Sequence, residues 1–175
     1  MAREDWGLDL MKRHRRLFVV KVEEPFRSAG YPFCGRGWAD ILERLCGRVE
    51  DALRAGETFE FVRIRRKFGI LRIDWESETC EDTEDQIGHA VNLAVARSAC
   101  SCEICGREGR LHNNKGWLET RCTDDAVGEP VPPRYGAGNV RRLRRWSGHA
   151  DMYFATYDRE TDTLNEVPRP SRKEG

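Results

Sequence analysis

Hydrophobic positions follow a helical period in two long segments. Between residues 37 and 56, apolar side chains recur every three or four positions, and charged residues fill most of the opposite side. These apolar positions are Trp38, Ile41, Leu42, Leu45, Cys46, Val49 and Ala52. A second segment begins at Thr83, which forms a capping-box pattern with Gln86. Its predicted buried stripe is Ile87, Ala90, Val91, Ala94, Val95 and Ser98. We predict two long amphipathic helices here, and a shorter helix within residues 5–18.

Between these two segments the pattern changes to the alternation of a β-hairpin. Residues 59–66 are rich in aromatic and β-branched side chains, and residues 71–75 place apolar side chains on alternate positions. Phe68 and Gly69 supply the turn, because glycine tolerates a positive φ. We expect Val62 and Ile64 to share the apolar face. The opposite face is expected to carry Arg63, Arg65 and Arg72. A two-stranded ribbon needs a cover, and the helix that starts near Trp38 is the expected one.

The most specific chemistry follows the second helix. Cys102 and Cys105 are separated by two residues, and Gly106 lets the backbone turn so that its amides face the thiolates. Sixteen residues separate Cys105 from Cys122. Asp125 follows Cys122 after two more residues, where a zinc ribbon would have its fourth cysteine. Carboxylates also bind zinc. We therefore predict a structural Zn²⁺ ion, and its predicted ligands are Cys102, Cys105, Cys122 and Asp125.

The identity of the fourth ligand stays open at this point. Asp124, His112, Cys100, Cys80 and water are alternatives to Asp125, and three sulfurs with a water would resemble an open, catalytic site. The zinc-deaminase pattern, His-x-Glu followed by Pro-Cys-x-x-Cys, is absent from the sequence, and so is the metalloprotease pattern His-Glu-x-x-His. We therefore expect a structural ion, whose binding free energy contributes to folding.

The C-terminal part of the sequence is less regular. Residues 128–139 contain three prolines and three glycines, which is typical of a linker or an irregular wrap. Residues 152–157 and 164–167 read as the strands of a hairpin, and residues 168–175 as a frayed end. The predicted fold class is α+β: two long amphipathic helices packed on a β-hairpin, followed by a zinc knuckle or ribbon and a C-terminal β-hairpin appendage. The predicted parts are a core of residues 1–127, a linker of residues 128–139, and a basic segment with the appendage in residues 140–175.

Composition narrows the class of protein. The 175 residues suffice for one domain, or for one domain with an appendage. The chain has no apolar run near 18 residues, and its first residues lack the apolar core of a signal peptide. Seven cysteines in a chain without an export signal favour reduced thiols and metal over disulfides. We expect a cytoplasmic protein, located in the host cytoplasm if a phage encodes it, with no membrane partner.

The net charge is zero, but the charges are segregated along the chain. Bases cluster in residues 12–16, 63–67 and 141–145, whereas residues 74–85 hold seven acids and no base. The acidic stretch either neutralises a basic cluster of the same molecule or helps to steer a charged partner. A tryptophan beside the last cluster suits stacking on RNA or single-stranded DNA. The candidate contacts for a partner or a nucleic acid are Arg63, Arg65, Arg66, Lys67, Arg72, Arg141, Arg142, Arg144, Arg145 and Trp146.

Several short blocks also occur in a fixed order. They are Gly37-Trp38 with Ile41-Leu42 and Leu45-Cys46, Lys67-Phe68-Gly69 with Leu71-Arg72, Cys102-Glu-x-Cys105-Gly, and Gly116-Trp117-Leu118-x-Thr120-x-Cys122. In this combination the chain resembles a family of small uncharacterised proteins of bacteria, their phages and prophages, over about residues 8–125. In that family the position of Asp125 is typically His or Cys, which completes a zinc site. The resemblance implies a genomic setting rather than an activity, and residues 126–175 lie outside it.

Three functions are consistent with the sequence. We expect first a non-enzymatic, zinc-binding accessory protein of phage or mobile-element type. It would bind and block a host protein or nucleoprotein complex, as an anti-CRISPR protein or similar counter-defence inhibitor does, and charge segregation is its physical support. The second is a nucleic-acid-binding zinc protein that uses residues 63–67 and 141–146. The third is a zinc hydrolase with an open coordination position. No catalytic residue is predicted, because no Ser-His-Asp set, glycine-rich phosphate loop or paired-carboxylate motif occurs.

Overall fold

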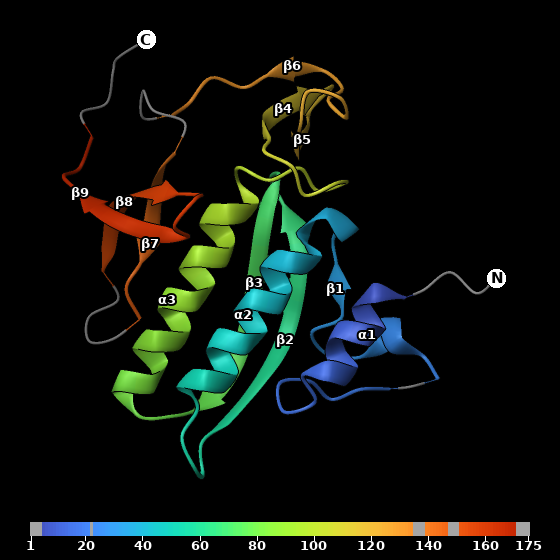
Figure 1. Ribbon diagram of the computed structural model, residues 1–175, viewed down its shortest axis with the longest axis vertical. Helices are drawn as coiled ribbons and strands as arrows, with labels where there is room; N and C mark the ends of the chain where they lie inside the picture. The colour runs from blue at the N-terminus through green and yellow to red at the C-terminus, as the bar shows by residue number, and fades with distance from the viewer. Residues whose placement is uncertain (1–4, 22, 135–138, 147–150, 171–175) are drawn as a thin grey trace.

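The computed structural model describes residues 5–21, 23–134, 139–146 and 151–170. Within these residues the strands form three sheets of three strands each (Figure 1). The elements are, in chain order, α1 (Trp6–Arg13), the 3₁₀ turn η1 (Pro25–Arg27), β1 (Pro32–Phe33), the 3₁₀ turn η2 (Arg36–Trp38), α2 (Ala39–Ala52), β2 (Thr58–Lys67), β3 (Ile70–Glu78), α3 (Glu81–Ser98), β4 (Arg110–Asn114), β5 (Trp117–Arg121), β6 (Glu129–Pro130), β7 (Val140–Arg144), β8 (Met152–Asp158) and β9 (Thr163–Val167).

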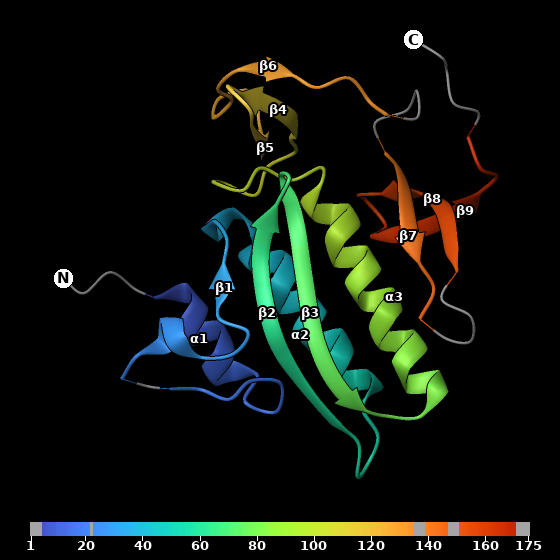
Figure 2. The same ribbon diagram turned by 180° about the vertical axis from the view of Figure 1, so that it is seen from behind.

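The first sheet has the strand order β1-β2-β3 and provides the main core. Strand β1 is parallel to β2, and β2 is antiparallel to β3. Helices α2 and α3 lie on one face of this sheet, and Figure 2 shows the other face free of any described element. The whole predicted apolar stripe of α2 is buried, because it meets α3 and the sheet. Trp38 at its start is fully buried and donates its indole N–H to the carbonyl of Ser101 at 2.8 Å.

The β2–β3 turn forms where the sequence predicted it, but one face of the hairpin was assigned incorrectly. Phe68 and Gly69 both have positive φ, 53° and 78°, as a tight hairpin turn requires. A β-bulge lies between Phe61 and Arg63, and it places Phe61 and Ile64 on the buried face. Val62 is therefore exposed, and the prediction that it shares the apolar face with Ile64 is wrong.

Helix α3 begins two residues before the predicted start. Cys80 is its N-cap residue, and Thr83 is fully buried inside the first turn, so the predicted capping box is wrong. The helix also buries two sides. Ile87 and its neighbours contact the main core, whereas Leu93 and Ala96 pack with Tyr157 of the third sheet. A helix between two sheets needs apolar residues on both sides. The predicted buried stripe covers only the side that faces the main core.

The predicted architecture of two long helices on a hairpin, with a knuckle and a hairpin appendage, is wrong. The chain is a mixed α+β protein with three small sheets. Strands β1 and β6 have two residues each, too few to show a periodic pattern. The arginines of β7 masked its alternation, in which Leu143 is the buried residue. What was read as a C-terminal hairpin is thus the β7-β8-β9 sheet.

The third sheet is held against α3 through Trp146, which follows β7. The Trp146 ring packs on Trp75 of β3, with ring centroids 4.5 Å apart. Gly88 of α3 makes room for this ring, because a Cβ atom at that position would overlap it. The side chain of Asn92 donates to the carbonyl of Arg144 at 2.8 Å. This sheet therefore packs on the core instead of projecting from it.

A second set of contacts joins the β8–β9 turn to both long helices. The carboxylate of Asp162 accepts from the Tyr157 hydroxyl at 2.5 Å and from Arg48 of α2 at 2.6 Å. Arg97 of α3 donates to the same Tyr157 oxygen at 3.0 Å. The division into parts at residues 128–139 stays a prediction. Residues 135–138 of that linker and residues 171–175 of the frayed end lie outside the described residues. In the part of the chain that is described, no helix has the length and apolar character needed to cross a membrane.

Candidate metal centre

Four predicted ligands converge beyond the end of α3. The three thiols and one carboxylate oxygen lie within 4.8 Å of one another, and they belong to Cys102, Cys105, Cys122 and Asp125. The Asp125 Oδ2 atom is 3.3 Å from the Cys102 Sγ and 3.1 Å from the Cys122 Sγ, and the Cys105 and Cys122 Sγ atoms are 3.6 Å apart. Tetrahedral zinc with its usual bond lengths would separate such donors by about 3.5–3.8 Å. The group can therefore hold a metal ion.

The turn that carries Cys102 and Cys105 depends on glycine. Gly106 has φ +77° and donates its amide to the Cys102 carbonyl at 2.8 Å. The Cys102 amide donates in turn to the Arg107 carbonyl at 2.7 Å. Gly37, which precedes α2, donates to the Glu103 carbonyl at 2.8 Å, and a Cβ atom on Gly37 would overlap the backbone of the turn. The start of α2 and the cysteine turn are therefore built against each other.

The β4–β5 hairpin brings Cys122 to the other two cysteines. Cys122 comes directly after β5, and the carbonyl of Thr120 on that strand accepts the Glu103 amide at 3.1 Å. The Thr120 hydroxyl donates to the carbonyl of Gly69 at 2.7 Å. One strand of the second sheet thus joins the metal group to the β2–β3 turn of the main sheet.

Glu103, the residue after the first cysteine, was not singled out from the sequence. Its side chain is buried, and its Oε1 atom accepts the Gly35 amide at 2.9 Å. Its Oε2 atom accepts from Arg66 at 3.1 Å and from Arg121 at 3.2 Å. A glutamate between two metal-binding cysteines gives no sequence signal of burial, because its partners lie far away along the chain. It connects the metal turn to β2, to β5 and to the loop before α2.

Arg159 of the β8–β9 turn also supports the site and was not singled out. One of its guanidinium nitrogens donates to the Cys100 carbonyl and to the Ser101 hydroxyl, and another donates to the Gly106 carbonyl at 2.9 Å. The backbone of the cysteine turn is thus held by the third sheet as well. Both this arginine and Glu103 act through contacts distant in sequence.

The donors modify one another's acidity. Hydrogen bonds from the three thiols lower the pKa of Asp125 below its usual value. Burial, together with the nearby Asp125 carboxylate, raises the pKa of Cys122 to about 11. A hydrogen bond from Arg107 lowers the pKa of Cys105. Deprotonated donors crowded in this way concentrate negative charge, which a divalent cation would neutralise.

The alternative fourth ligands lie elsewhere. The Cys100 thiol donates to the Arg97 carbonyl at 3.3 Å, and the His112 Nδ1 atom faces the Arg110 carbonyl at 3.0 Å. Asp124 forms an ion pair with Arg107 at 2.7 Å. Cys80 lies at the opposite end of α3. Among the described residues, Asp125 is the carboxylate that joins the three thiols.

The basic residues proposed as partner contacts separate into two groups. Strand alternation places Arg63, Arg65 and Lys67 of β2 and Arg72 of β3 on the uncovered face of the main sheet (Figure 2). Arg66 points the other way and pairs with Glu103 and Glu119. In the second group, Arg141 is half-buried and Arg142 is exposed. The guanidinium carbon of Arg144 lies 4.5 Å from the centre of the Trp146 ring, and Arg145 forms an ion pair with Glu166 at 2.6 Å. The Trp146 ring itself packs on Trp75.

Among the described residues, the acidic stretch of residues 74–85 forms no ion pair with the basic cluster of residues 141–145, which lies on β7 and the residue after it. Asp74 pairs with Arg72 two residues away, and Asp82 pairs with Arg54 beyond the end of α2. Among the described residues, the ion pairs of residues 74–85 therefore stay near the main sheet and the start of α3.

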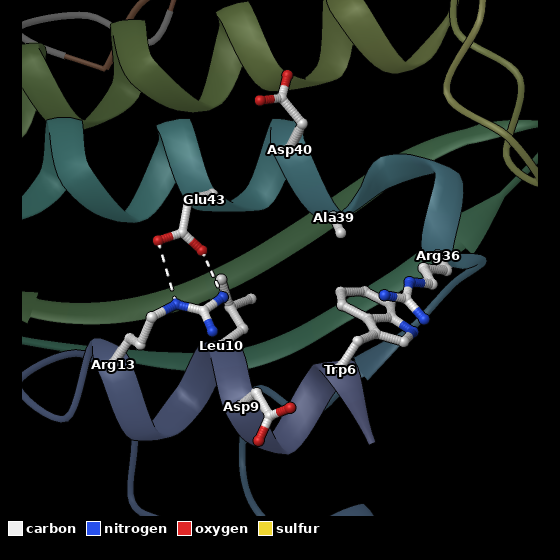
Figure 3. A pocket seen from close by; sticks show the side chains of 8 residues that line it. All are labelled: Trp6, Asp9, Leu10, Arg13, Arg36, Ala39, Asp40 and Glu43. Carbon is white, nitrogen blue, oxygen red and sulfur yellow. Dashed lines mark hydrogen bonds and ion pairs between the residues drawn. The ribbon is translucent and has the colours of Figure 1, made fainter. Parts of the chain in front are cut away.

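A hollow of about 310 Å³ lies between α1 and α2 and shows no reactive arrangement (Figure 3). Trp6 and Arg36 lie at one end of it, and at the other end Arg13 donates twice to Glu43, at 3.3 and 2.7 Å. Asp40 points away and pairs with Arg44. Charges that are paired in this way offer no general base or nucleophile to a substrate.

Comparison with known proteins identifies no relative of this chain. Neither a protein-family model, nor a curated protein, nor a solved structure matches the chain.

Proposed function

We propose that this chain is a non-enzymatic binding protein whose fold is completed by a structural zinc ion. The observation that carries the proposal is the group of three thiols and one carboxylate, in which each donor is a protein side chain. Structural zinc sites are closed in this way, whereas catalytic sites keep one position for water or substrate. The turn that holds the donors is also bonded to all three sheets, so the ion would join parts of the fold.

The donor set favours zinc over other common ions. Thiolates are soft ligands that select zinc, copper(I) or iron–sulfur clusters, whereas magnesium and calcium prefer oxygen donors. The close spacing of the Cys105 and Cys122 sulfurs, 3.6 Å, fits one tetrahedral ion. The Asp125 carboxylate would then be the fourth ligand.

A zinc hydrolase is the weaker alternative. It would need a bound water and a free acid or base near the metal. The nearest buried carboxylate outside the donors, Glu103, is occupied by three donors from Gly35, Arg66 and Arg121. This saturated environment supports a structural role for that glutamate rather than proton transfer.

The first test is the metal content of the purified protein. We expect one zinc per chain in the wild type by elemental analysis, and a weaker affinity in Asp125→Ala, measured by competition with a chelator. Asp124→Ala and Cys100→Ser are matched controls, because both residues lie near the group without belonging to it. Wild-type protein that binds no zinc after refolding with the ion would overturn the proposal.

A second test separates a structural ion from a catalytic one. Chelation should lower the melting temperature and unfold the region around the metal, because the free energy of metal binding is part of the folding free energy. A chelated protein that keeps its melting temperature but loses a hydrolytic activity would support the hydrolase instead.

The resemblance to phage and prophage proteins supports a setting in which the partner is a host protein or nucleoprotein complex that becomes blocked. A tagged, zinc-loaded chain should then retain one defined bacterial complex from lysate and inhibit its activity after purification. Recovery of no complex from a natural host, or recovery of one that keeps full activity, would contradict this part of the proposal.

A further inference from the structure

The uncovered face of the main sheet carries an ordered row of three side chains. In the register of the sheet, Phe33 of β1 lies beside Arg65 of β2, and Arg65 lies opposite Arg72 of β3. Register partners point to the same side of a sheet. The row therefore consists of one aromatic ring and two guanidinium groups across neighbouring strands. It lies near the β2–β3 turn, whose Gly69 carbonyl accepts from Thr120 of β5.

The positive charge of this surface is poorly compensated. Like charges placed directly opposite each other destabilise a strand pair, and Arg65 and Arg72 are such a pair. Arg63 and Lys67 flank Arg65 on the same face, and among the described residues neither forms an ion pair. Among the described residues, the acid beside these bases is Asp74, which lies opposite Arg63 in the register and pairs with Arg72 at 3.2 Å. An anionic partner would remove this repulsion.

Arg65 has an additional polar group without a partner. Its Nε atom is covered by the surrounding protein and has no hydrogen-bond acceptor. A buried donor without an acceptor is destabilising, because it has lost its hydrogen bonds to water without a replacement. A ligand oxygen that reached this nitrogen would recover part of that cost.

A hollow of about 300 Å³ adjoins the row, and its lining includes Tyr31, Phe33, Val62, Arg63 and Arg65. Phe33 is 57% exposed and meets the edge of Tyr31, with ring centroids 5.1 Å apart. An exposed aromatic ring next to unpaired arginines matches the chemistry of a nucleotide, in which a planar base is linked to a phosphate. The hollow is far too small for a duplex.

We propose that the Phe33–Arg65–Arg72 row, with Arg63 beside it, binds single-stranded nucleic acid. A base stacks on Phe33, and the arginines contact the adjoining phosphates. This inference deepens the proposed function by naming the chemistry of the partner, such as the exposed strand of a nucleoprotein complex. An acidic protein segment would meet the same charges, but it would leave the aromatic part of the surface without a role.

The test is fluorescence anisotropy with zinc-loaded full-length protein and a labelled single strand of about 15 nucleotides, thymidine in one series and uridine in another. We expect saturable binding at about 20 mM salt that weakens steeply as salt rises. Phe33→Ala should weaken binding about tenfold through lost stacking. Arg65→Ala should weaken it and make the salt dependence shallower by about one released ion. Arg142→Ala removes an exposed arginine from the other cluster and should change affinity by less than about twofold.

Three results would overturn the inference: no binding by the wild type at the lowest salt, tighter binding to a duplex, or equal weakening by Arg142→Ala and Arg65→Ala. Competition by an oligoglutamate peptide, with no effect of Phe33→Ala, would assign the surface to an acidic protein instead. Zinc content and melting temperature are measured for each variant. Wild type that holds zinc but binds no single strand contradicts only this inference, and wild type that binds the strand without zinc contradicts only the metal proposal.

Discussion

Strand β2 carries Arg63, Arg65, Arg66 and Lys67, and strand β7 with the residue after it carries Arg141, Arg142, Arg144 and Arg145. The two runs look alike in the sequence, but their surroundings differ. On β2, three of the four bases face an uncovered sheet surface and form no ion pair among the described residues. On β7, one guanidinium lies over Trp146 and another binds Glu166. Arg141 is half-buried, and its Nε atom, like that of Arg65, has no acceptor among the described residues.

The two runs carry similar charge but differ in how their sheets are covered, and on our proposal this difference separates a binding surface from a structural one. The β7-β8-β9 sheet is attached to β3 by the Trp146 ring and to α3 by the Arg144 carbonyl, which accepts from Asn92. The main sheet has α2 and α3 on one face, and no described element covers the face that carries its outward arginines. Substitutions should therefore affect stability at one strand and binding at the other.

The largest expected effect on stability comes from β2 itself, because one arginine of its run has a structural role. Arg66 alternates with Arg65 but points inward to Glu103, whose buried carboxylate it shares with Arg121. Glu103→Gln leaves Glu119 as the one carboxylate that pairs with both guanidinium groups, and it removes a charged acceptor from a buried position. We expect a loss of about 3 kcal/mol in the free energy of unfolding. Urea denaturation at equal zinc occupancy measures it. Glu108→Gln, at an exposed position of the same turn, is the control and should change stability little. Equal losses in the two variants would contradict the role of Glu103.

The next effect concerns the attachment of the third sheet. Gly88→Ala places a methyl group where the Trp146 ring lies on Trp75. Although alanine favours a helix over glycine by about 1 kcal/mol, we expect a net loss of about 2 kcal/mol, because overpacking forces the tryptophan out. Urea denaturation and near-ultraviolet circular dichroism of the tryptophans measure the change.

Gly47→Ala provides the matched control for this substitution. Gly47 lies inside α2, and a Cβ atom there would meet no atom within 4 Å. The same change should stabilise the protein by about 0.5–1 kcal/mol. A stabilising effect at both glycines would show that Trp146 does not hold the sheet in place.

A smaller effect, about 1–2 kcal/mol, is expected from Asp162→Asn, which removes the charge that receives Arg48. Burial alone would raise the pKa of Asp162, but hydrogen bonds from Tyr157 and Arg48 outweigh it and lower that pKa. A lowered folded-state pKa contributes stability above the unfolded value of about 4, and this contribution is lost as the pH falls through the folded value. The difference between wild type and variant should therefore be full at neutral pH and decline as the pH falls below the unfolded value and through the lowered pKa of Asp162. A difference that does not change with pH would contradict the ionic role.

Parts of this organisation could be predicted from the sequence because they depend on local spacing. The apolar stripe of α2, the Phe68-Gly69 turn and the group of Cys102, Cys105, Cys122 and Asp125 all follow from intervals between neighbouring residues. A helical period or a Cys-x-x-Cys interval restricts geometry whatever the remainder of the chain does.

The parts that were missed depend on contacts between distant residues. Burial of Glu103 requires Gly35 and Arg66, and the position of Arg159 requires the Gly106 carbonyl, so neither can be inferred from neighbouring residues. The second apolar side of α3, with Leu93 and Ala96, was not predicted, because its cover, Tyr157, lies about 60 residues further along the chain. The bulge after Phe61 moved Val62 to the other face, and no residue type specified it.

The smallest effect compares single arginines of the two runs directly. Arg145 donates to both oxygens of Glu166, at 2.7 and 2.6 Å, but both side chains are about half exposed, so Arg145→Ala should cost only about 0.5 kcal/mol. Arg63 lies opposite Asp74 without an ion pair among the described residues, and it is repelled by Arg65 on the same face. The two effects of Arg63→Ala offset each other, so the stability of this variant should stay nearly unchanged. Thermal denaturation at low and high salt measures both, and the Arg145 effect should shrink as salt screens the pair. A larger loss for Arg63→Ala than for Arg145→Ala would mean that the β2 arginines stabilise the fold, which would remove the reason for assigning them to a partner.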